Sequence, residues 1–441
     1  MNLLSKQAQT AIGILRSEGY EAYAVGGCTR DMLMGRECQD TDITTSALPS
    51  EIKAVFSDFR TVDTGIKHGT VTVIIESVPL EITTYRIEKG YSDGRHPDEV
   101  CFTVNLAEDL KRRDFTVNSI AYCPEKGFVD PFGGKEDIER KIIRCVGNPN
   151  ERFTEDSLRI LRGLRFASVL GFSIEKETAD AMRECRELLH TVSKERVFSE
   201  LSKMLCGDNI RYVLVNYCDI LEVVLPEIKG MKGFDQHNFH HIYDILEHTA
   251  AVTESIAPLP HLRFAALFHD CGKTDCFSLD ENGTGHFYSH PSISAKKADG
   301  ALLRLKSDTK TREKVVKLVK VHDTPIEESE RIIKKRLRSM GKELFFDLIK
   351  LQRADTEGLA PEFHGRKEHF DTLERMAEEI IEGEACFSLK DLKISGNDLI
   401  KEGFKGKEIG SALSASLEAV IDGKINNEKE ELICFCLRNR N

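Results

Sequence analysis

The chain has 441 residues, of which 40% are hydrophobic and 31% charged, and its formal net charge is −11. This length predicts more than one domain, and the negative charge argues against a protein that coats nucleic acid with a wholly basic surface. No apolar run approaches the roughly 18 residues of a membrane span, and the N-terminus lacks a signal-peptide pattern, so we expect a cytoplasmic protein without membrane contact. The 13 cysteines include no CxxC pair, and we expect most of them to be buried thiols.

Residues 22–45 predict a short apolar strand, a glycine turn, a brief helix and a second strand. Asp40 and Asp42 are expected on the second strand, where side chains two residues apart point to the same face. Two like charges on one face are costly unless a cation lies between them, so the pair indicates a divalent metal site. A solvated strand end is the alternative. The turn at Gly26 and Gly27 lacks Cβ atoms and can approach a phosphate closely.

Residues 71–85 predict two further strands, and Glu81 lies on the second of them. A third carboxylate from a neighbouring strand would complete a two-metal site, whereas a merely solvated Glu is the alternative. The polar segment that follows, residues 87–100, carries Arg95 and is interpreted either as a functional loop or as a mobile surface hairpin.

A basic pair, Arg112 and Arg113, stands with Asp114 just before an apolar helix start. Adjacent arginines on an otherwise acidic chain suit triphosphate oxygens, because guanidinium groups bind such oxygens bidentately. The sequence therefore predicts a nucleotide-phosphate contact at this position.

After the turn at residues 130–134 the composition shifts from strand formers to helix formers, and we expect α-helices almost throughout to the C-terminus. Residues 152–172 predict a helix capped by Thr154, with a polar stripe that recurs every three residues: Asp156, Arg159, Arg162 and Arg165. Such a stripe is typical of a solvated face with ion pairs. An Asp and an Arg about one turn apart also offer an acceptor and a donor fork for the edge of a base.

A domain boundary is expected at Lys229-Gly230, and a second group of potential ligands lies beyond it. The group comprises His248, His269, Asp270 and Asp355, with His290 and His322 as further candidates. Each histidine alone is more typical of a packed or exposed residue. Together they supply nitrogen and oxygen ligands for a divalent transition-metal ion.

Four motifs occur in the order and spacing of one family: GGCTRD…DTD, RRDFTVNSIAY, DPFGG and FTEDSLRILRGLRFA. By these motifs the chain resembles the class II tRNA nucleotidyltransferases, which comprise the CCA-adding enzymes and bacterial poly(A) polymerases. The resemblance implies an α+β fold, with a polymerase-β-like head (mixed sheet and helices) followed by an all-α neck, an HD-type body and a tail. The implied boundaries are 1–148 for the head, 149–228 for the neck, 229–360 for the body and 361–441 for a tail that contacts tRNA.

The resemblance also implies roles for individual residues. These are Mg²⁺ binding for Asp40 and Asp42; the triphosphate pocket for Gly26, Gly27 and Arg30; ribose and phosphate contacts for Arg113 and Asp114; and base reading for Asp156 and Arg159, with Arg162 and Arg165 nearby. The loop that holds Asp93 and Arg95 is similar to the flexible loop with which family members switch from C to A addition. The HD form of the body implies a transition-metal ion (Mn, Ni, Co or Fe) and an additional phosphohydrolase activity.

The function implied is template-independent addition of CCA to the 3′ end of tRNA from CTP and ATP, by two-metal-ion nucleotidyl transfer. A poly(A) polymerase or A-adding enzyme is the alternative within the family. A metal-dependent phosphohydrolase with an RNA-binding head, or a non-catalytic RNA-binding protein, are alternatives from other classes. The paired carboxylates count against these last two, because binding alone needs no metal site. No protein partner is indicated.

Overall fold

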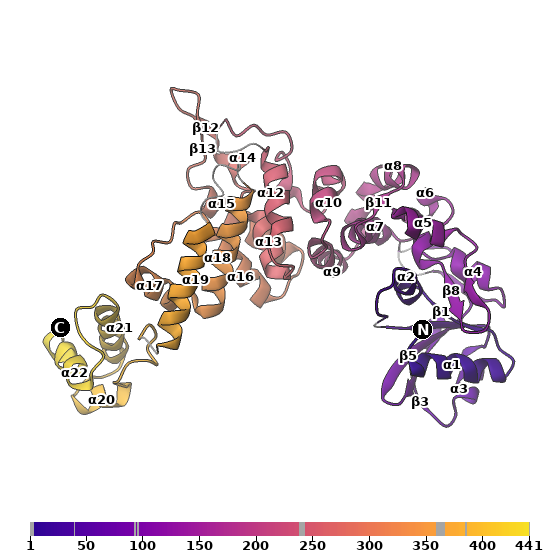
Figure 1. Cartoon of the computed structure of the whole chain (residues 1–441), viewed down its shortest axis with the longest axis horizontal. Helices are drawn as coiled ribbons and strands as arrows, with labels where there is room; N and C mark the ends of the chain where they lie inside the picture. The colour runs from indigo at the N-terminus through magenta and orange to yellow at the C-terminus, as the bar shows by residue number, and fades with distance from the viewer. Residues whose placement is uncertain are drawn as a thin grey trace. The chain divides into compact units, whose positions relative to one another are not determined.

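The computed structural model describes residues 4–38, 40–91, 94, 97–237, 243–358, 367–383 and 386–440. The chain divides into two compact units, coloured along the chain in Figure 1. The first unit spans residues 1–229 together with 304–306, and the second spans residues 230–303 and 307–441. None of the described helices is long and apolar enough to cross a lipid bilayer.

A seven-stranded sheet organises the N-terminal part of the first unit. Its strands are β1 (Ala22–Val25), β2 (Asp42–Thr45), β3 (Arg60–Gly65), β4 (Thr70–Ile75), β5 (Val78–Thr84), β8 (Ala121–Cys123) and β9 (Gly127–Val129). The spatial order is β3-β4-β5-β2-β1-β8-β9, and β2 and β5 run parallel while the other neighbours are antiparallel. The expected mixed sheet is confirmed.

Short helices and a hairpin surround this sheet. The helices are α1 (Lys6–Ser17), α2 (Gly27–Leu33), α3 (Pro49–Val55), α4 (Leu106–Lys111) and α5 (Gly134–Arg140), and the hairpin pairs β6 (Arg86–Lys89) with β7 (Glu99–Phe102). The core is apolar and closed: Ile12 of α1 packs with Tyr23, Ile43 and Ile82 of the central strands, all of them buried. Because β1 is buried at every position, the chain just after it is held rigidly in place.

Helices make up most of the rest of the first unit. They are α6 (Pro149–Glu155), α7 (Leu158–Leu170), α8 (Lys176–Glu184), α9 (Lys194–Leu205), α10 (Ile210–Asn216) and α11 (Cys218–Leu221), and the short strands β10 (Ile142–Ile143) and β11 (Ser173–Ile174) pair in parallel. The single helix expected over residues 152–172 is wrong. Asp156 has an extended backbone between α6 and α7, and its carboxylate accepts a hydrogen bond from Leu158 N at the start of α7. This local bond competes with continuation of the helix.

The second unit is almost entirely helical, with one short hairpin, β12 (Ser278–Leu279) and β13 (Gly285–His286). Its helices are α12 (Ile245–Ser255), α13 (Pro260–Phe268), α14 (Lys273–Cys276), α15 (His290–Arg304), α16 (Thr309–Val321), α17 (Glu330–Met340), α18 (Lys342–Glu357), α19 (Lys367–Glu382), α20 (Gly396–Lys401), α21 (Lys407–Ile421) and α22 (Lys429–Arg438). Every residue of helix α13 from Leu262 to Phe268 is buried, and α12, α16 and α18 pack around this helix. This all-round burial explains its continuous apolar sequence.

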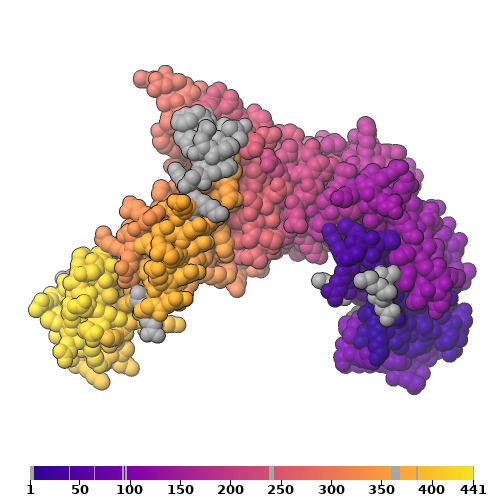
Figure 2. Space-filling model, viewed as in Figure 1, coloured from indigo at the N-terminus to yellow at the C-terminus, as the bar shows by residue number. Residues whose placement is uncertain are grey.

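The last three helices, which lie in the yellow part of the chain in Figure 2, pack on a small core of their own. Leu399, Phe404, Leu417 and Leu432 are buried in it. These apolar side chains form a cluster of their own, to which α13 does not contribute.

One disulfide joins α2 to the segment that precedes β2, between Cys28 and Cys38. The Cα atoms of this pair are 5.1 Å apart because the chain turns back on itself after α2. These two cysteines are exceptions to the expectation that most cysteines are thiols, and the other described cysteines are free.

Candidate functional site

The first cluster of predicted residues lies at the start of β2. Asp42 is the first residue of the strand, and Asp40 precedes the strand instead of lying on it as expected. Burial raises the pKa of the Asp42 carboxyl despite the nearby Arg113 guanidinium, and repulsion from Asp40 adds to the rise. A cation would relieve this cost, and carboxylate oxygens are ligands that suit Mg²⁺. The residues present therefore fit a magnesium site.

Glu81 lies next to Asp42 in the register of the parallel β2–β5 pair. Strands in a sheet are about 4.8 Å apart, and residues in register point to the same face. Glu81 is exposed, so its carboxylate is accessible on the face that it shares with Asp42. Among the described residues, groups of three ligand side chains with donor atoms within 4.8 Å of one another occur in the second unit and not here.

The glycine turn brings the backbone against these charged groups. Gly26 has φ of 78°, a conformation that side chains other than hydrogen disfavour. A Cβ atom built on Gly26 would lie 3.6 Å from Asp42 Oδ2 and 3.4 Å from Arg113 Nη1. A Cβ on Gly27 would lie 3.5 Å from Arg30 Nη2. The turn therefore leaves space beside one carboxylate and two guanidinium groups.

Arg113 has the environment of a phosphate-binding group. Its Nε is buried and has no hydrogen-bond partner among the described residues, and its Nη2 lies 3.7 Å from Asp109 Oδ2. Burial lowers the pKa of this guanidinium, which still carries its charge in protein. An unpartnered buried donor is costly, so an anionic ligand that accepts from it would be stabilised.

Arg30 makes more contacts with neighbouring side chains than Arg113 does. It pairs with Asp31 at 2.9 Å and donates from Nη1 to Asn118 Oδ1 at 2.8 Å. Its guanidinium is also 5.4 Å from the centre of the Phe166 ring, a cation–π distance. These contacts fix the orientation of Arg30 beside the glycine turn.

Asp114 faces the protein interior and is tied to α7. Arg162 donates to Asp114 Oδ2 from Nε at 2.8 Å and from Nη2 at 2.5 Å, while Asn118 donates to Oδ1 at 3.2 Å. Burial raises the pKa of this carboxyl, but Arg162 and the hydrogen bonds outweigh it and leave the pKa at about 2. Asp114 and Arg162 therefore form a buried ion pair rather than two free ligand groups.

The two residues expected to read a base are not paired with each other. Asp156 Oδ2 accepts from Arg196 Nη2 of α9 at 2.9 Å. Arg159 donates to Glu155 Oε2 at 2.9 Å and to the carbonyl oxygen of Arg112 at 3.1 Å. Arg196 and Glu155 were missed by the sequence reasoning, because nothing in their local pattern marks them as partners.

Arg165, the last of the predicted stripe, pairs with Glu200 of α9 at 2.6 Å and lies 4.1 Å over the Phe166 ring. It therefore holds α7 against α9. The remaining predicted pair, Asp93 and Arg95, lies outside the described residues.

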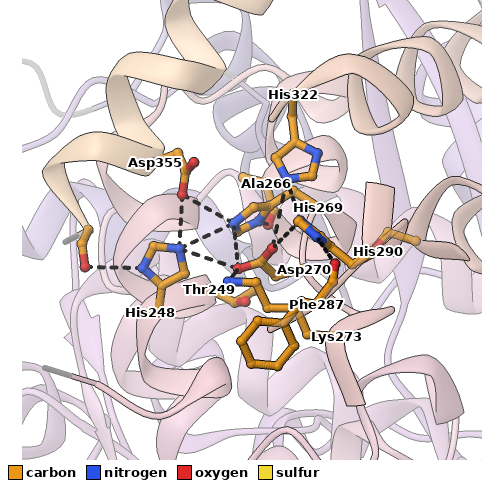
Figure 3. A network of polar contacts seen from close by, with 12 residues as sticks. His248, Thr249, Ala266, His269, Asp270, Lys273, Phe287, His290, His322 and Asp355 are labelled. Carbon is orange, nitrogen blue, oxygen red and sulfur yellow. Dashed lines mark hydrogen bonds and ion pairs between the residues drawn. The ribbon is translucent and has the colours of Figure 1, made fainter. Parts of the chain in front are cut away.

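The second cluster brings all six predicted ligands together (Figure 3). They come from five helices or helix ends: His248 from α12, His269 and Asp270 after α13, His290 from α15, His322 after α16, and Asp355 from α18. Asp355 is partly exposed and the other five are buried. Lys273 lies beside them, with Nζ 2.7 Å from Asp270 Oδ2. Buried His and Asp side chains in contact are typical of a transition-metal site.

Three family models match parts of the chain. A "Poly A polymerase head domain" matches residues 22–144, a "Probable RNA and SrmB- binding site of polymerase A" matches residues 171–231, and a model of tRNA nucleotidyltransferase domain 2 matches residues 286–436.

Several curated proteins are similar to the chain. A CCA-adding enzyme of Enterococcus faecalis is 51% identical over 204 residues, which are 46% of this chain and 50% of that protein. The chain thus spans about half the length of this relative. It likewise covers 56% of a CCA-adding enzyme of Lactobacillus helveticus and 55% of one of Limosilactobacillus reuteri. A CCA-adding enzyme of Bacillus velezensis is 34% identical over 423 residues, covering 95% of this chain and 94% of that protein.

Among solved structures, a Bacillus stearothermophilus CCA-adding enzyme in complex with CTP is similar with a TM-score of 0.72. It is 29% identical, and the alignment covers 99% of this chain and 97% of that one. The mixed sheet followed by helices is thus shared along almost the whole chain.

Proposed function

The chain belongs to the family of CCA-adding enzymes, since a relative 34% identical to it aligns over 94% of its own length, and we propose that it adds CCA to the 3′ end of tRNA from CTP and ATP. The observation that carries this proposal is the meeting of Asp42, Gly26 and Arg113. A Cβ built on Gly26 would lie within 4 Å of both the Asp42 carboxylate and the Arg113 guanidinium, and the buried Nε of Arg113 has no hydrogen-bond partner among the described residues. This combination suits a nucleoside triphosphate with its metal ion.

The proposed reaction is a nucleotidyl transfer. The tRNA 3′ oxygen forms a bond to the α-phosphorus while the bond from that phosphorus to the bridging oxygen of the pyrophosphate breaks, and the hydroxyl proton leaves to solvent. Mg²⁺, when bound, supplies activation of the hydroxyl and neutralises the triphosphate charge. Asp40 and Asp42 would hold it, with Glu81 as a third carboxylate ligand.

The other charged residues orient the nucleotide. The turn at Gly26 and Gly27 lets the triphosphate approach the backbone, and Arg113 and Arg30 offer donors to its oxygens. Asp114 contributes at the same point by fixing the segment that carries Arg113. The protein thereby holds the α-phosphorus in line with the tRNA hydroxyl, which is most of what phosphoryl transfer requires.

We assign base choice to Asp156 and Arg159. In the structure each is held by another residue, Arg196 and Glu155 respectively. A base that accepts from the guanidinium and donates to the carboxylate would replace these contacts, while a wrong base would leave a buried polar group unsatisfied at a cost of about 1–3 kcal/mol. Arg162 and Arg165 support this pair through Asp114 and α9 rather than by touching the base.

The loop with Asp93 and Arg95 is assigned the switch from C to A addition. This assignment favours complete CCA addition over the addition of CC alone. We further propose the four parts 1–148, 149–228, 229–360 and 361–441 as head, neck, body and tail. The tail and the basic residues of α17 would contact tRNA in the cytoplasm, where the substrate is found.

The experiment that tests the activity supplies the protein with tRNA lacking its 3′ terminal nucleotides, together with CTP, ATP or both. Addition of two C followed by one A supports the proposal. A long A tail with ATP alone identifies a poly(A) polymerase, and no incorporation under any of the three conditions contradicts nucleotidyl transfer altogether.

We propose a second activity, metal-dependent hydrolysis of phosphate esters, for the second unit. The specific observation is the buried contact of four histidines with Asp270 and Asp355. Mn, Ni, Co and Fe ions suit such nitrogen-rich ligands. Substitution Asp270→Ala is expected to abolish hydrolysis and to leave CCA addition unchanged, because Asp270 and the head residues belong to different units. Loss of both activities in a folded variant contradicts two separate sites.

A further inference from the structure

We propose that Cys28 and Cys38 form a reversible disulfide that acts as a redox switch on the site at Asp40 and Asp42, with the oxidised chain binding Mg²⁺ and nucleotide more tightly than the reduced chain. The structure joins the two cysteines, whose Cα atoms are 5.1 Å apart and which are 10 positions apart in sequence. The inference rests on the nucleotide site proposed above for its effect, whereas formation of the disulfide itself needs no activity at that site.

The disulfide contacts the residue that separates the two carboxylates. Thr41 Oγ1 lies 3.6 Å from Cys28 Sγ and 3.6 Å from Cys38 Sγ. Cys38 Sγ also lies 3.6 Å from the carbonyl oxygen of Asp40. Asp40 thus stands two residues after the disulfide and two residues before Asp42, the first residue of β2. The oxidised chain therefore holds the Asp40 backbone from both sides.

Cys28 is the fixed end of the disulfide. It is only 3% exposed and lies on α2, directly after Gly27 of the glycine turn. The hydroxyl of the next residue, Thr29, lies 2.9 Å from the carbonyl oxygens of Gly26 and Ile120 and donates to them. These contacts hold α2 in place, so a covalent bond to Cys28 fixes the attached segment relative to the glycine turn.

Cys38 is the less constrained end. It lies between α2 and β2, in residues 34–41, whose described members form neither helix nor strand. Its side chain is half-buried, and the three residues before it are exposed. On reduction the two sulfur atoms must separate to van der Waals contact. Because α2 is held by its own contacts, the displacement falls on Cys38 and on the residues next to it, which include Asp40.

This difference between the two redox states changes the affinity for a metal ion. A ligand group that is already held in its bound position loses less conformational freedom when the ion binds, so the ion binds more tightly. A disulfide that closes a short loop removes many of the other conformations of that loop. Oxidation is therefore expected to raise the affinity of the Asp40 and Asp42 carboxylates for Mg²⁺, and reduction to lower it.

The disulfide is not needed to hold the fold together. A chain of this length buries enough apolar surface to fold without covalent links. Cys28 and Cys38 both pack against the apolar core that contains Ile12 and Ile43. The other described cysteines remain thiols, including the exposed Cys434. In chains that keep their thiols, an isolated disulfide is typical of a transient, redox-sensing pair.

The oxidant is a low-molecular-weight disulfide. The sulfur of Cys38, the more accessible of the two, bonds to one sulfur of this disulfide, whose S–S bond breaks, and the first small thiol leaves with the Cys38 proton. The sulfur of Cys28 then bonds to Cys38 Sγ, and the second small thiol leaves with the Cys28 proton. The two cysteines lose two electrons and two protons, which the small disulfide gains. An excess of the small thiol reverses both steps.

The test measures the disulfide equilibrium without any catalytic step. The full chain is equilibrated in mixtures of reduced and oxidised glutathione, alkylated, and analysed by peptide mass spectrometry for the Cys28–Cys38 disulfide. The series is repeated with Mg²⁺ and CTP in the absence of tRNA. If oxidation tightens binding, the bound ligands must favour oxidation by the same factor, and we expect an increase of about 5-fold or more in the equilibrium constant. Absence of the disulfide at every ratio, or an equilibrium constant that Mg²⁺ and CTP leave unchanged, overturns the proposal.

Two variants show whether the effect arises at the proposed site. Asp42→Asn is expected to form the disulfide but to lose the shift caused by Mg²⁺ and CTP, because a ligand charge is missing. The matched control is Cys434→Ser, which removes an exposed thiol on α22 and should keep both the disulfide and the shift. A shift that persists in Asp42→Asn, or that disappears in Cys434→Ser, overturns the assignment to this pair and this site.

Incorporation of CTP into tRNA lacking its 3′ end provides the functional readout. We expect reduction to raise the Mg²⁺ concentration for half-maximal rate by about 5-fold or more. Cys38→Ser, at a half-buried position that tolerates the change, should show the higher requirement with and without oxidant. An equal Mg²⁺ requirement in both redox states of the unsubstituted chain overturns the switch. If neither state incorporates nucleotide, nucleotidyl transfer is contradicted, and the glutathione equilibrium still decides whether the disulfide and the site are coupled.

Discussion

Asp42 and Glu81 occupy register positions opposite each other on the parallel strands β2 and β5, and Asp42 also pairs with Val25, the last residue of β1 before the glycine turn. Parallel neighbours place both carboxylates on the same face. Because Asp40 lies before the strand, Glu81 is the residue that the sheet itself holds beside Asp42. Substitution of Asp42 and of Glu81 can therefore measure how much each carboxylate contributes to metal binding.

Asp42→Asn is expected to lower nucleotide incorporation by roughly 1,000-fold or more, since it removes a ligand charge from the group that stabilises the transition state. The affinity for tRNA should change little, because phosphate contacts of RNA come from cations. The measurement pairs single-turnover incorporation of CTP with a tRNA-binding assay. Asp58→Asn, an exposed carboxylate in the same unit, is the control and should keep full activity. Incorporation that survives in Asp42→Asn contradicts the assignment.

Glu81→Gln is expected to have a smaller effect with a different signature. If Glu81 shares a metal ion with Asp42, the concentration of Mg²⁺ needed for half-maximal rate rises several-fold, and part of the activity returns at high Mg²⁺. Rates are measured across a Mg²⁺ titration and compared with Glu18→Gln, an exposed residue after α1. A lowered rate with an unchanged Mg²⁺ dependence would show that Glu81 acts only on the packing of the strand.

Local sequence signals were sufficient to predict several of these features. The glycine turn, the Asp40/Asp42 pair and the basic pair at Arg113 are visible because each is encoded by adjacent residues. The change from strands to helices also follows from the change in composition after residue 134, whereas the mixed character of the sheet was implied by the family resemblance. In the second unit, the six ligands are recognisable because several histidines, an adjacent His-Asp pair and a later Asp together supply nitrogen and oxygen ligands.

Other features depend on contacts between distant segments, which no local pattern encodes. The register that places Glu81 beside Asp42 is a property of strand pairing. The partner of Asp156, Arg196, lies on another helix. The break before α7 was missed because the apolar periodicity continues across it, although the Asp156 side chain competes with the helix. The contacts of Asp270 with four histidines require particular side-chain orientations as well as positions.

Base selection offers a further test through Asp156 and its structural partner. Asp156→Ala is expected to reduce the preference for CTP over UTP by about 5- to 150-fold, which corresponds to the roughly 1–3 kcal/mol of an unsatisfied polar group. Arg196→Gln breaks the 2.9 Å contact with Asp156 but leaves the reading carboxylate in place. It should therefore retain most of the preference. The measurement is kcat/KM for each nucleotide; an equal loss of preference in both variants would assign base selection to the ion pair as a unit.

The ion pair between Asp114 and Arg162 predicts a specific dependence of stability on pH. The pKa of Asp114 is about 2 in the folded chain, below the ordinary value of 3.8 that applies when it unfolds. A lowered carboxyl pKa stabilises the fold above the unfolded value, and this stabilisation is lost as the pH falls from about 4 to about 2. At about 1.4 kcal/mol per pKa unit the contribution near neutrality is roughly 2 kcal/mol.

Asp114→Asn should accordingly destabilise the first unit by about 2 kcal/mol at pH 7 and by much less at pH 2, where the wild-type carboxyl has lost its advantage. Urea unfolding followed by circular dichroism at pH 7, 4 and 2 measures this difference. The matched control is Asp180→Asn, which breaks a solvent-exposed ion pair with Lys176 on α8. Exposed pairs contribute little to stability, so this variant should unfold like the wild type at each pH. A constant difference between Asp114→Asn and wild type from pH 7 to pH 2 would show that Asp114 acts through packing and hydrogen bonds, without a contribution from its charge.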